Sequence, residues 1–323
     1  PTCPPHLSAL GSLASPTPMG APHARGAVVG LLAVPLGGIL LGSRWRHMQQ
    51  EDAQRLCRRY RGQRPAGPVA ADNATCKVPQ HMQKLTVLCG HLELVVHDET
   101  KSRFLTPTLR SQGYWEVQHP QDVAVVARVT LPKTGVFLDL GANIGWYTLL
   151  YAMMGYRVIA VEPLPLNRRA LEASLCLHPE LRELVTVVPA ALGAPEDVGR
   201  RCAIRGEVLR CDVEGAMVAA CDETSDPLCS DEIEVRTLDG ILRELAPASL
   251  DVVKMDIEGG ECAALRGGQS LFGQYRPRLL QVETWPPTSP SGACVQQEAD
   301  RHGYRTKHLP GSFDTLMIRG DFI

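Results

Sequence analysis

The sequence has no excess of charge of either sign and few aromatic side chains. Its 323 residues contain 33 Lys and Arg against 35 Asp and Glu, a formal net charge of −2. No overall attraction to nucleic acid is therefore implied. Only 5% of the residues are Phe, Trp or Tyr, which argues against a surface that stacks bases. We therefore expect no nucleic-acid partner. The length of the chain is enough for one large hydrophobic core or two modest ones.

Acidic residues are missing from the beginning of the chain. Residues 1–25 contain none, and residues 26–43, GAVVGLLAVPLGGILLGS, carry no charge at all. A run of this length reaches the lower limit for a membrane-spanning helix, although its glycines and Pro35 weaken the case. We predict that residues 1–77 are a leader, with a membrane anchor over 26–43 followed by an arginine-rich stem. A signal or transit segment, or a disordered leader, is the alternative.

Two features of the stem disagree about its compartment. Seven arginines lie between Arg44 and Arg64, and the positive-inside rule keeps such a segment in the cytosol. Asn73-Ala74-Thr75 is a glycosylation sequon, which is used only in the secretory lumen. We expect a membrane-anchored protein of the Golgi or secretory lumen, with another organelle or the cytoplasm as alternatives.

The cysteines lack the short C-x-x-C pairs of zinc sites. Four of the eleven lie within residues 193–232, namely Cys202, Cys211, Cys221 and Cys229. Disulfides in a lumenal insertion and free thiols are both compatible with this spacing. Cys176 and Cys262 lie on predicted helices, where we expect buried thiols. The odd total leaves at least one cysteine without a partner in the chain.

Residues 136–145, VFLDLGANIG, join a short apolar run to a helix-like segment. The turn contains Gly141, Asn143 and Gly145, and glycines allow the backbone to approach a ligand at a helix N-terminus. A dinucleotide fingerprint, G-x-G-x-x-G, would have a glycine where Asn143 stands. Asn tolerates the left-handed backbone that such a turn needs. The pattern favours S-adenosylmethionine over NAD.

Apolar runs alternate with helical patterns from residue 135 onward. We predict strands over 136–140, 157–161, 184–188, 251–255 and 277–283, with helices between them. This alternation indicates an α/β fold with a doubly wound, mostly parallel, Rossmann-like sheet. Residues 135–323 are then the cofactor-binding domain, with an irregular, cysteine-rich insertion at 193–232. Residues 78–134 form an N-terminal cap region.

An acid stands at the end of four predicted strands: Asp139, Glu162, Asp256 and Glu283. Open parallel sheets bind ligands beyond the carboxyl ends of their strands. Glu162 follows Gly141 by 21 residues, the place of a carboxylate that binds both ribose hydroxyls. Asp139 would act indirectly, through N–H groups of the turn or the ammonium of the methionine portion.

A second dense group of acids lies in the segment KMDIEGGE: Asp256, Glu258 and Glu261. Three carboxylates at one strand end could bind a metal, hold the cofactor's ammonium group or serve as general base. We predict these three as catalytic residues and assign no metal. His178, His302 and His308 are isolated in the sequence, and we expect them at the surface or in packing.

Four segments together resemble the FkbM-type methyltransferases: DLGANIGWYTLLYA, VIAVEPLPLNRRALEASLCLH, VRTLDGIL and KMDIEGGECAALRGG. The resemblance covers about residues 112–310 and includes Gly113, Trp115 and Glu116. It implies a class I methyltransferase fold, S-adenosylmethionine as cofactor and O-methylation of a hydroxyl. It would place Asp256 and Glu258 near the reacting centre, and these residues at the cofactor: Asp139, Gly141, Asn143, Gly145 and Glu162.

One departure concerns the segment after the strand over 277–283. The chain reads ETWPP there, where many relatives have E-x-H, so this chain offers no histidine base at that point.

The sequence therefore predicts a methyltransferase that uses S-adenosylmethionine and methylates a hydroxyl of a glycan or small molecule. Two rival functions remain at this point. One is an NAD-dependent oxidoreductase, and the other is a membrane-tethered protein that keeps the fold without catalysis.

Overall fold

The computed structural model describes residues 57–58, 60, 76–206, 216–218, 232–284, 290–310 and 312–322. The chain divides into two compact units, residues 1–52 and 53–323, and all that follows concerns the second. The predicted anchor over 26–43, the sequon at Asn73 and Cys211, Cys221 and Cys229 lie outside the described residues, as does the side chain of Cys202. Within the described ranges, no helix is both long and apolar enough to cross a membrane.

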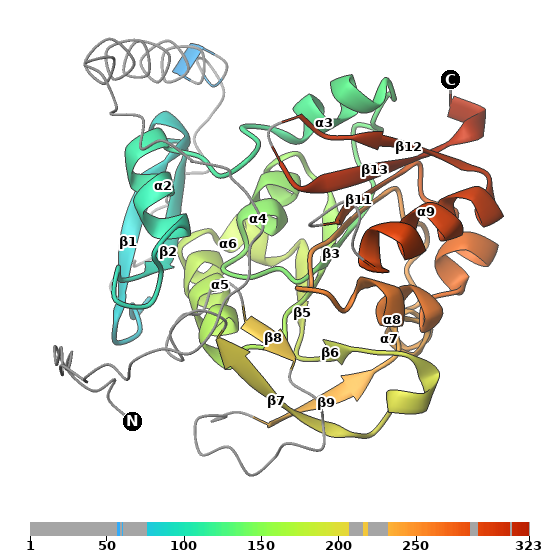
Figure 1. The fold of residues 1–323 in the computed structure, drawn as a ribbon. Helices are drawn as coiled ribbons and strands as arrows, with labels where there is room; N and C mark the ends of the chain where they lie inside the picture. The colour runs from blue at the N-terminus through green and yellow to red at the C-terminus, as the bar shows by residue number, and fades with distance from the viewer. Residues whose placement is uncertain are drawn as a thin grey trace, which may run out of the picture. The chain divides into compact units, whose positions relative to one another are not determined.

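A seven-stranded sheet forms the centre of this unit (Figure 1). Five adjacent strands are parallel and reach one edge of the sheet, and the two strands at the other edge run antiparallel to their neighbours. The predicted doubly wound sheet is thereby confirmed, and each predicted strand over 136–283 is found within two residues of its expected bounds. In spatial order the strands are β12 (Tyr304–His308), β13 (Asp314–Arg319), β11 (Leu279–Glu283), β10 (Val252–Met255), β3 (Val136–Leu140), β4 (Arg157–Val161) and β5 (Val185–Val188).

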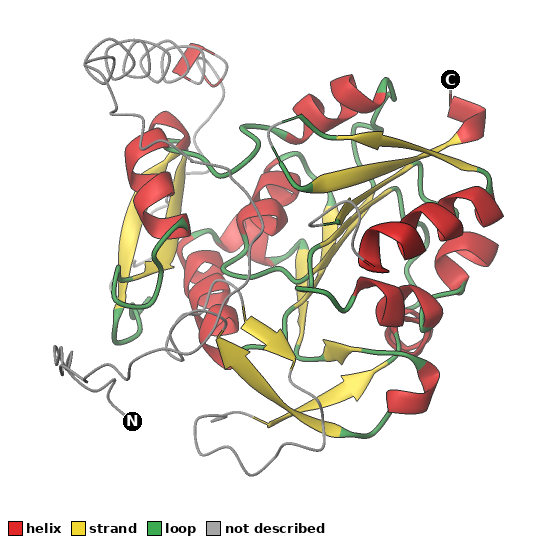
Figure 2. Cartoon of the chain, in the orientation of Figure 1, coloured by secondary structure: helices red, strands yellow, loops and turns green. Residues whose placement is uncertain are grey.

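Both faces of this sheet are covered by helices (Figure 2). Successive strand residues point to opposite faces, so Phe137 belongs to one apolar cluster and Leu138 to the other. The first cluster includes α3 (Pro120–Ala127), α4 (Trp146–Met153), α5 (Pro165–Leu177) and α6 (Pro179–Arg182). The second includes α7 (Leu238–Leu245), α8 (Glu261–Arg266) and α9 (Pro290–His302).

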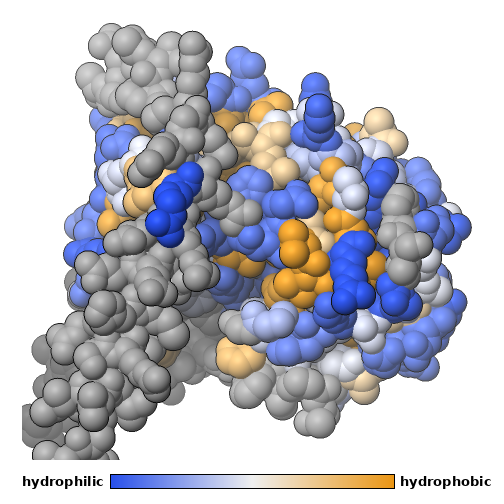
Figure 3. Space-filling view, turned by 90° about the horizontal axis from the view of Figure 1, so that it is seen from above, coloured by the Kyte–Doolittle hydropathy of each residue, from blue (hydrophilic) through white to orange (hydrophobic). Residues whose placement is uncertain are grey.

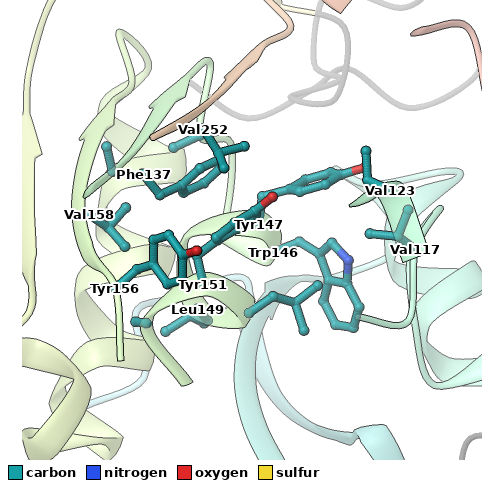
Figure 4. Close-up of a cluster of buried hydrophobic side chains, with 14 of the residues drawn as sticks. Val117, Val123, Phe137, Trp146, Tyr147, Leu149, Tyr151, Tyr156, Val158 and Val252 are labelled. Atoms are coloured by element: carbon teal, nitrogen blue, oxygen red, sulfur yellow. The ribbon is translucent and has the colours of Figure 1, made fainter. Parts of the chain in front are cut away.

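Aromatic rings fill the first cluster beneath the middle of the sheet (Figure 4). Tyr151 stacks on Phe137 with ring centroids 3.7 Å apart, and Tyr156 meets Tyr151 edge to face. The coloured part of the surface in Figure 3 is mostly hydrophilic, with hydrophobic side chains in several separate groups. Helices and apolar side chains bury both faces of the strands. Acidic side chains of these strands are therefore expected only at the strand ends or in networks that pair their charge.

The N-terminal region forms a hairpin of β1 (Met82–Val87) and β2 (Leu92–His97), joined by the 3-10 turn η2 (Leu88–Gly90) and followed by α2 (Leu105–Gln112). Its strand β2 lies against α5, where the backbone N–H of Val95 donates to Ser174 Oγ at 2.8 Å. This region and the cofactor-binding region belong to the same compact unit.

The part of residues 193–232 that the structure describes is more regular than expected. Strands β7 (Arg201–Gly206) and β8 (Ala216–Val218) join β6 (Ala191–Leu192) and β9 (Glu232–Arg236) in a small separate sheet. The prediction of an irregular insertion over residues 193–232 was therefore wrong for β7 and β8. The two strands span only six and three residues, and runs this short carry little periodic signal in the sequence.

Three disulfides lie among the described cysteines: Cys57–Cys89, Cys76–Cys176 and Cys262–Cys294. The expectation of buried free thiols at Cys176 and Cys262 was wrong. Both do lie on helices, α5 and α8, but their partners come from segments 100 and 32 residues away in the chain. Local sequence carries no signal for such pairing.

Candidate active site

The turn after β3 is held by contacts with other parts of the protein. Gly141, Asn143 and Gly145 have φ of 83°, 52° and 91°, the left-handed backbone that glycine and asparagine accept most readily. A Cβ on Gly141 would overlap the backbone carbonyl oxygen of Asp256, and one on Gly145 would overlap the side chain of Leu171. The glycines are therefore required by packing against the end of β10 and against α5, a reason that differs from the expected approach to a ligand.

Glu162 lies buried at the end of β4 and organises this turn. Its Oε2 accepts from the Asn143 N–H at 2.8 Å, and its Oε1 from the Leu164 N–H at 2.9 Å and from Asn167 Nδ2 at 3.4 Å. A carboxylate has about four acceptor positions, so about one remains for a ribose hydroxyl. Burial raises the pKa of Glu162 to about 7, against the lowering effect of these donors.

A further polar atom at the turn has no partner in the described part of the protein. Asn143 Oδ1 is buried without a hydrogen bond. Buried polar groups are nearly always paired, so this oxygen fits a donor from a bound molecule. The turn, the start of α4 and Glu162 are the groups that would hold the methionine and ribose portions of S-adenosylmethionine.

Asp139 is buried behind the turn and faces α4. Its Oδ2 accepts from Thr148 Oγ1 at 2.5 Å, and burial raises the pKa of its carboxyl to about 6. The predicted partners were an N–H of the turn or the ammonium of the methionine portion; the partner in the structure is instead the hydroxyl of Thr148 on α4. Asp139 therefore fastens the end of β3 to the first turns of the helix that follows it.

Three carboxylates meet at the neighbouring strand ends. One oxygen each from Asp256, Glu258 and Glu283 lie within 4.8 Å of one another, because β10 and β11 are adjacent and parallel. All three are partly exposed. Burial, the charge of Asp256 and a hydrogen bond with Asp256 raise the pKa of Glu283 well above its usual range. Oxygen ligands in this arrangement could hold a divalent cation, or Glu283 and Asp256 could share one proton.

Glu261 does not join this group. Its side chain is buried, Oε1 accepts from the N–H groups of Ile257 and Gly259 at 3.3 and 3.1 Å, and Oε2 accepts from Ser291 Oγ at 2.7 Å. The sequence placed it with the catalytic acids, but both oxygens bind the surrounding loop and the start of α9. This geometry favours a positioning role for Glu261 over the predicted catalytic one.

A buried ion network, which sequence reasoning missed, lies under the acids. Lys254 Nζ is 3.1 Å from Asp256 Oδ2 and 3.1 Å from Asp314 Oδ1. Burial lowers the pKa of this lysine, but the carboxylates around it raise that pKa well above its ordinary value. Lysine is rarely fully buried unless it is paired, so a lysine inside the apolar strand VVKM was the available signal.

The network extends to the N-terminal region. Gln281 Nε2 donates to Asp314 Oδ2 and, at 2.9 Å, to Tyr147 OH, which donates to Glu116 Oε2 at 2.9 Å. Glu116 has a φ of 51° in a tight turn in which the Val117 N–H bonds the Trp115 carbonyl at 2.5 Å. Partial removal from water and the charges of Asp314 and Asp256 raise the pKa of the Glu116 carboxyl, although the residue as a whole is exposed. Strained residues gather at functional sites, and Glu116 brings a fourth accessible acid to this one.

The fold is a doubly wound sheet with a glycine turn after its first parallel strand. An acid suited to bind a ribose lies at the end of the next strand, and further acids lie beyond the fourth parallel strand. This combination is that of a class I methyltransferase dependent on S-adenosylmethionine. A family model described as the methyltransferase FkbM domain matches residues 139–306, slightly more than half of the chain. The chain belongs to the FkbM methyltransferase family, and S-adenosylmethionine, in place of NAD, is its cofactor.

Two curated relatives match this chain, and one of them is named as a methyltransferase. Methyltransferase sdnD of Sordaria araneosa is 28% identical over 62% of this chain and 85% of its own length. AMB antimetabolite synthetase AmbE of Pseudomonas aeruginosa is 29% identical over 54% of this chain, a match that spans 10% of that much longer protein.

Solved structures with a similar arrangement show low overall agreement. Fibrillarin from Aeropyrum pernix with bound S-adenosylmethionine has a TM-score of 0.35 and 12% identity, over 61% of this chain and 72% of its own. A precorrin-6y C5,15-methyltransferase from Geobacter metallireducens has a TM-score of 0.36 and 12% identity, over 61% and 84%.

Proposed function

We propose that this methyltransferase methylates a hydroxyl group of a glycan or small-molecule acceptor. The observation that carries the proposal is the meeting of Asp256, Glu258 and Glu283 directly beside the glycine turn. Gly141 packs so closely on Asp256 that even a methyl group would not fit between them. A cofactor on the turn and an acceptor at the acids would therefore share one space, as methyl transfer requires.

S-adenosylmethionine, when bound, supplies an activated methyl group. The residues of this chain then have to align the acceptor oxygen and remove its proton. Asp256 is the proton acceptor that we favour, because its side chain is 30% exposed and Lys254 holds it from the buried side. Glu283, with its raised pKa, stays protonated at neutral pH and donates a hydrogen bond to Asp256. Glu116 offers its carboxylate to a second hydroxyl of the acceptor.

Transfer from tritium-labelled S-adenosylmethionine to a panel of glycosides and small alcohols tests the proposal. We expect label in a base-stable methyl ether, identified by mass spectrometry. Asp256→Asn should lower the turnover number about 100-fold or more without a change in cofactor affinity, while Asp300→Asn, an exposed change on α9, should have no effect. Label in an ester or an amine would refute O-methylation of hydroxyls, and cofactor binding without any transfer would support the non-catalytic alternative.

We also propose that the enzyme works in an oxidising compartment, attached to a membrane through residues 26–43. The support is the disulfide set, since Cys57–Cys89 and Cys76–Cys176 both tie N-terminal segments to the folded unit. Disulfides persist in secretory compartments and are rare in the cytosol. The test is expression in cells, with glycosidase treatment for Asn73 and thiol alkylation under non-reducing conditions. Reduced cysteines together with an unmodified Asn73 would overturn this part of the proposal.

A further inference from the structure

A line of hydrogen bonds connects the N-terminal hairpin to the carboxylate at the cofactor site. His97 Nε2, at the end of β2, lies 2.8 Å from Asn167 Oδ1 on α5. Asn167 Nδ2 lies 3.4 Å from Glu162 Oε1, whose other oxygen accepts from the N–H of Asn143. The three side chains are 3%, 3% and 4% exposed, so water does not compete for these bonds.

The chemistry of the partners sets the direction of each bond. An ionised Glu162 only accepts hydrogen bonds, so Asn167 turns its amide NH₂ toward it. The amide oxygen of Asn167 then faces His97, and that ring nitrogen must carry a hydrogen. Glu162 and His97 thus favour the same orientation of the Asn167 amide from its two sides.

We propose that His97 is a positioning residue for the cofactor: through Asn167 it holds Glu162 in the rotamer that receives a ribose hydroxyl. The proposal rests on the role of Glu162 at the ribose in the proposed methyltransferase. Without His97, the amide oxygen of Asn167 loses this hydrogen bond, and the donor that Asn167 directs at Glu162 is held less firmly. The N-terminal hairpin then contributes to cofactor affinity without touching the cofactor.

Other contacts already hold the hairpin to α5, so His97 is not needed for that alone. Val95 bonds Ser174, and Cys76 is linked to Cys176 on the same helix. His178 provides a matched control, since it is equally buried and its Nε2 lies 2.8 Å from the carbonyl of Glu93 on β2. This bond spans the same interface but ends at a backbone carbonyl and does not lead to Glu162.

Isothermal titration of the full chain with S-adenosylmethionine tests the proposal, with the melting temperature measured in parallel. We expect His97→Leu to weaken binding about five- to tenfold, the loss of roughly one hydrogen bond. His97→Gln, whose amide can still donate to Asn167, should restore affinity to within about twofold. His178→Leu should lower the melting temperature about as much as His97→Leu does, while its affinity for S-adenosylmethionine stays within about twofold of wild type.

A double-mutant cycle shows whether the effect passes through Asn167. Asn167→Leu should weaken binding by itself, and adding His97→Leu should weaken it no further. If His97→Leu does not fold, His97→Asn, whose shorter side chain does not reach Asn167, takes its place. Unchanged affinity in folded His97→Leu or His97→Asn, equal weakening by His178→Leu, or additive effects would each overturn the inference. A wild-type protein that binds no S-adenosylmethionine would overturn the proposed function itself.

Discussion

Replacing Glu162 with Gln should weaken cofactor binding and, at the same time, remove the destabilising ionisation of a buried carboxyl. The two effects can be measured separately. The substitution keeps the shape of the side chain and removes its charge. The ribose hydroxyl then loses a charged acceptor, and hydrogen bonds to charged groups contribute about 1.5–3 kcal/mol. We therefore expect the dissociation constant for S-adenosylmethionine at pH 8 to rise by about 10- to 150-fold.

The effect on stability follows from the same burial. The pKa of Glu162 rises from 4.5 to about 7 in the folded protein, and each pH unit corresponds to about 1.4 kcal/mol. A group whose folded pKa is raised in this way costs nothing at low pH, where it is protonated in both states. Its ionisation lowers the free energy of unfolding as pH increases from about 4.5 to about 7, by about 3 kcal/mol in total.

Urea unfolding at several pH values, together with titration calorimetry, tests both effects. In Glu162→Gln this contribution to the pH dependence should disappear, while cofactor affinity falls. Gln leaves one of the two backbone N–H donors poorly paired, and this loss offsets part of the stability gained at pH 8 by removing the buried charge. The clearer change should therefore be in the pH dependence of the free energy of unfolding. Wild-type affinity for the cofactor in the variant, or an unchanged slope between pH 5 and pH 8, would refute the assignment of Glu162.

Three further changes test the rest of the site. Gly141→Ala should cost about 3 kcal/mol of unfolding free energy, because the new Cβ overlaps the Asp256 carbonyl at a positive φ; Gly199→Ala, with a similar φ and open space around it, should cost about 1 kcal/mol, and equal losses in urea would count against the packing argument. Lys254→Met should cost about 3–5 kcal/mol in the same assay, because it leaves Asp314 buried without its cation, and a second change, Asp314→Asn, should recover part of the loss. Glu116→Gly should leave the melting temperature nearly unchanged, because relief of the positive φ offsets the lost hydrogen bond to Tyr147; it should also leave cofactor affinity unchanged and reduce methyl transfer to the acceptor. Full transfer activity in that variant would contradict an acceptor role for Glu116.

The central sheet and the cofactor half of the site could be read from the sequence because they are local. The run VFLDL, the turn through Gly145 and the helix after it follow one another in the chain, and each has its own periodicity or turn chemistry. Asp256 and Glu283 could be expected at one edge because the carboxyl ends of parallel strands meet there. The neighbouring β10 and β11 bring them together as this rule requires.

The sequence by itself thus determined the succession of strands and helices that form the parallel sheet, the nucleotide-type turn and the family. Only the tertiary structure decided which side chains meet. Lys254 and Asp314 are 60 residues apart, Tyr147 and Glu116 are 31 apart, and Cys76 and Cys176 are 100 apart. Glu261 stands close to Asp256 and Glu258 in the sequence, yet its carboxylate turns into the loop. Contacts between distant segments depend on how helices and strands pack and on the rotamer each side chain adopts there, and no local pattern encodes either.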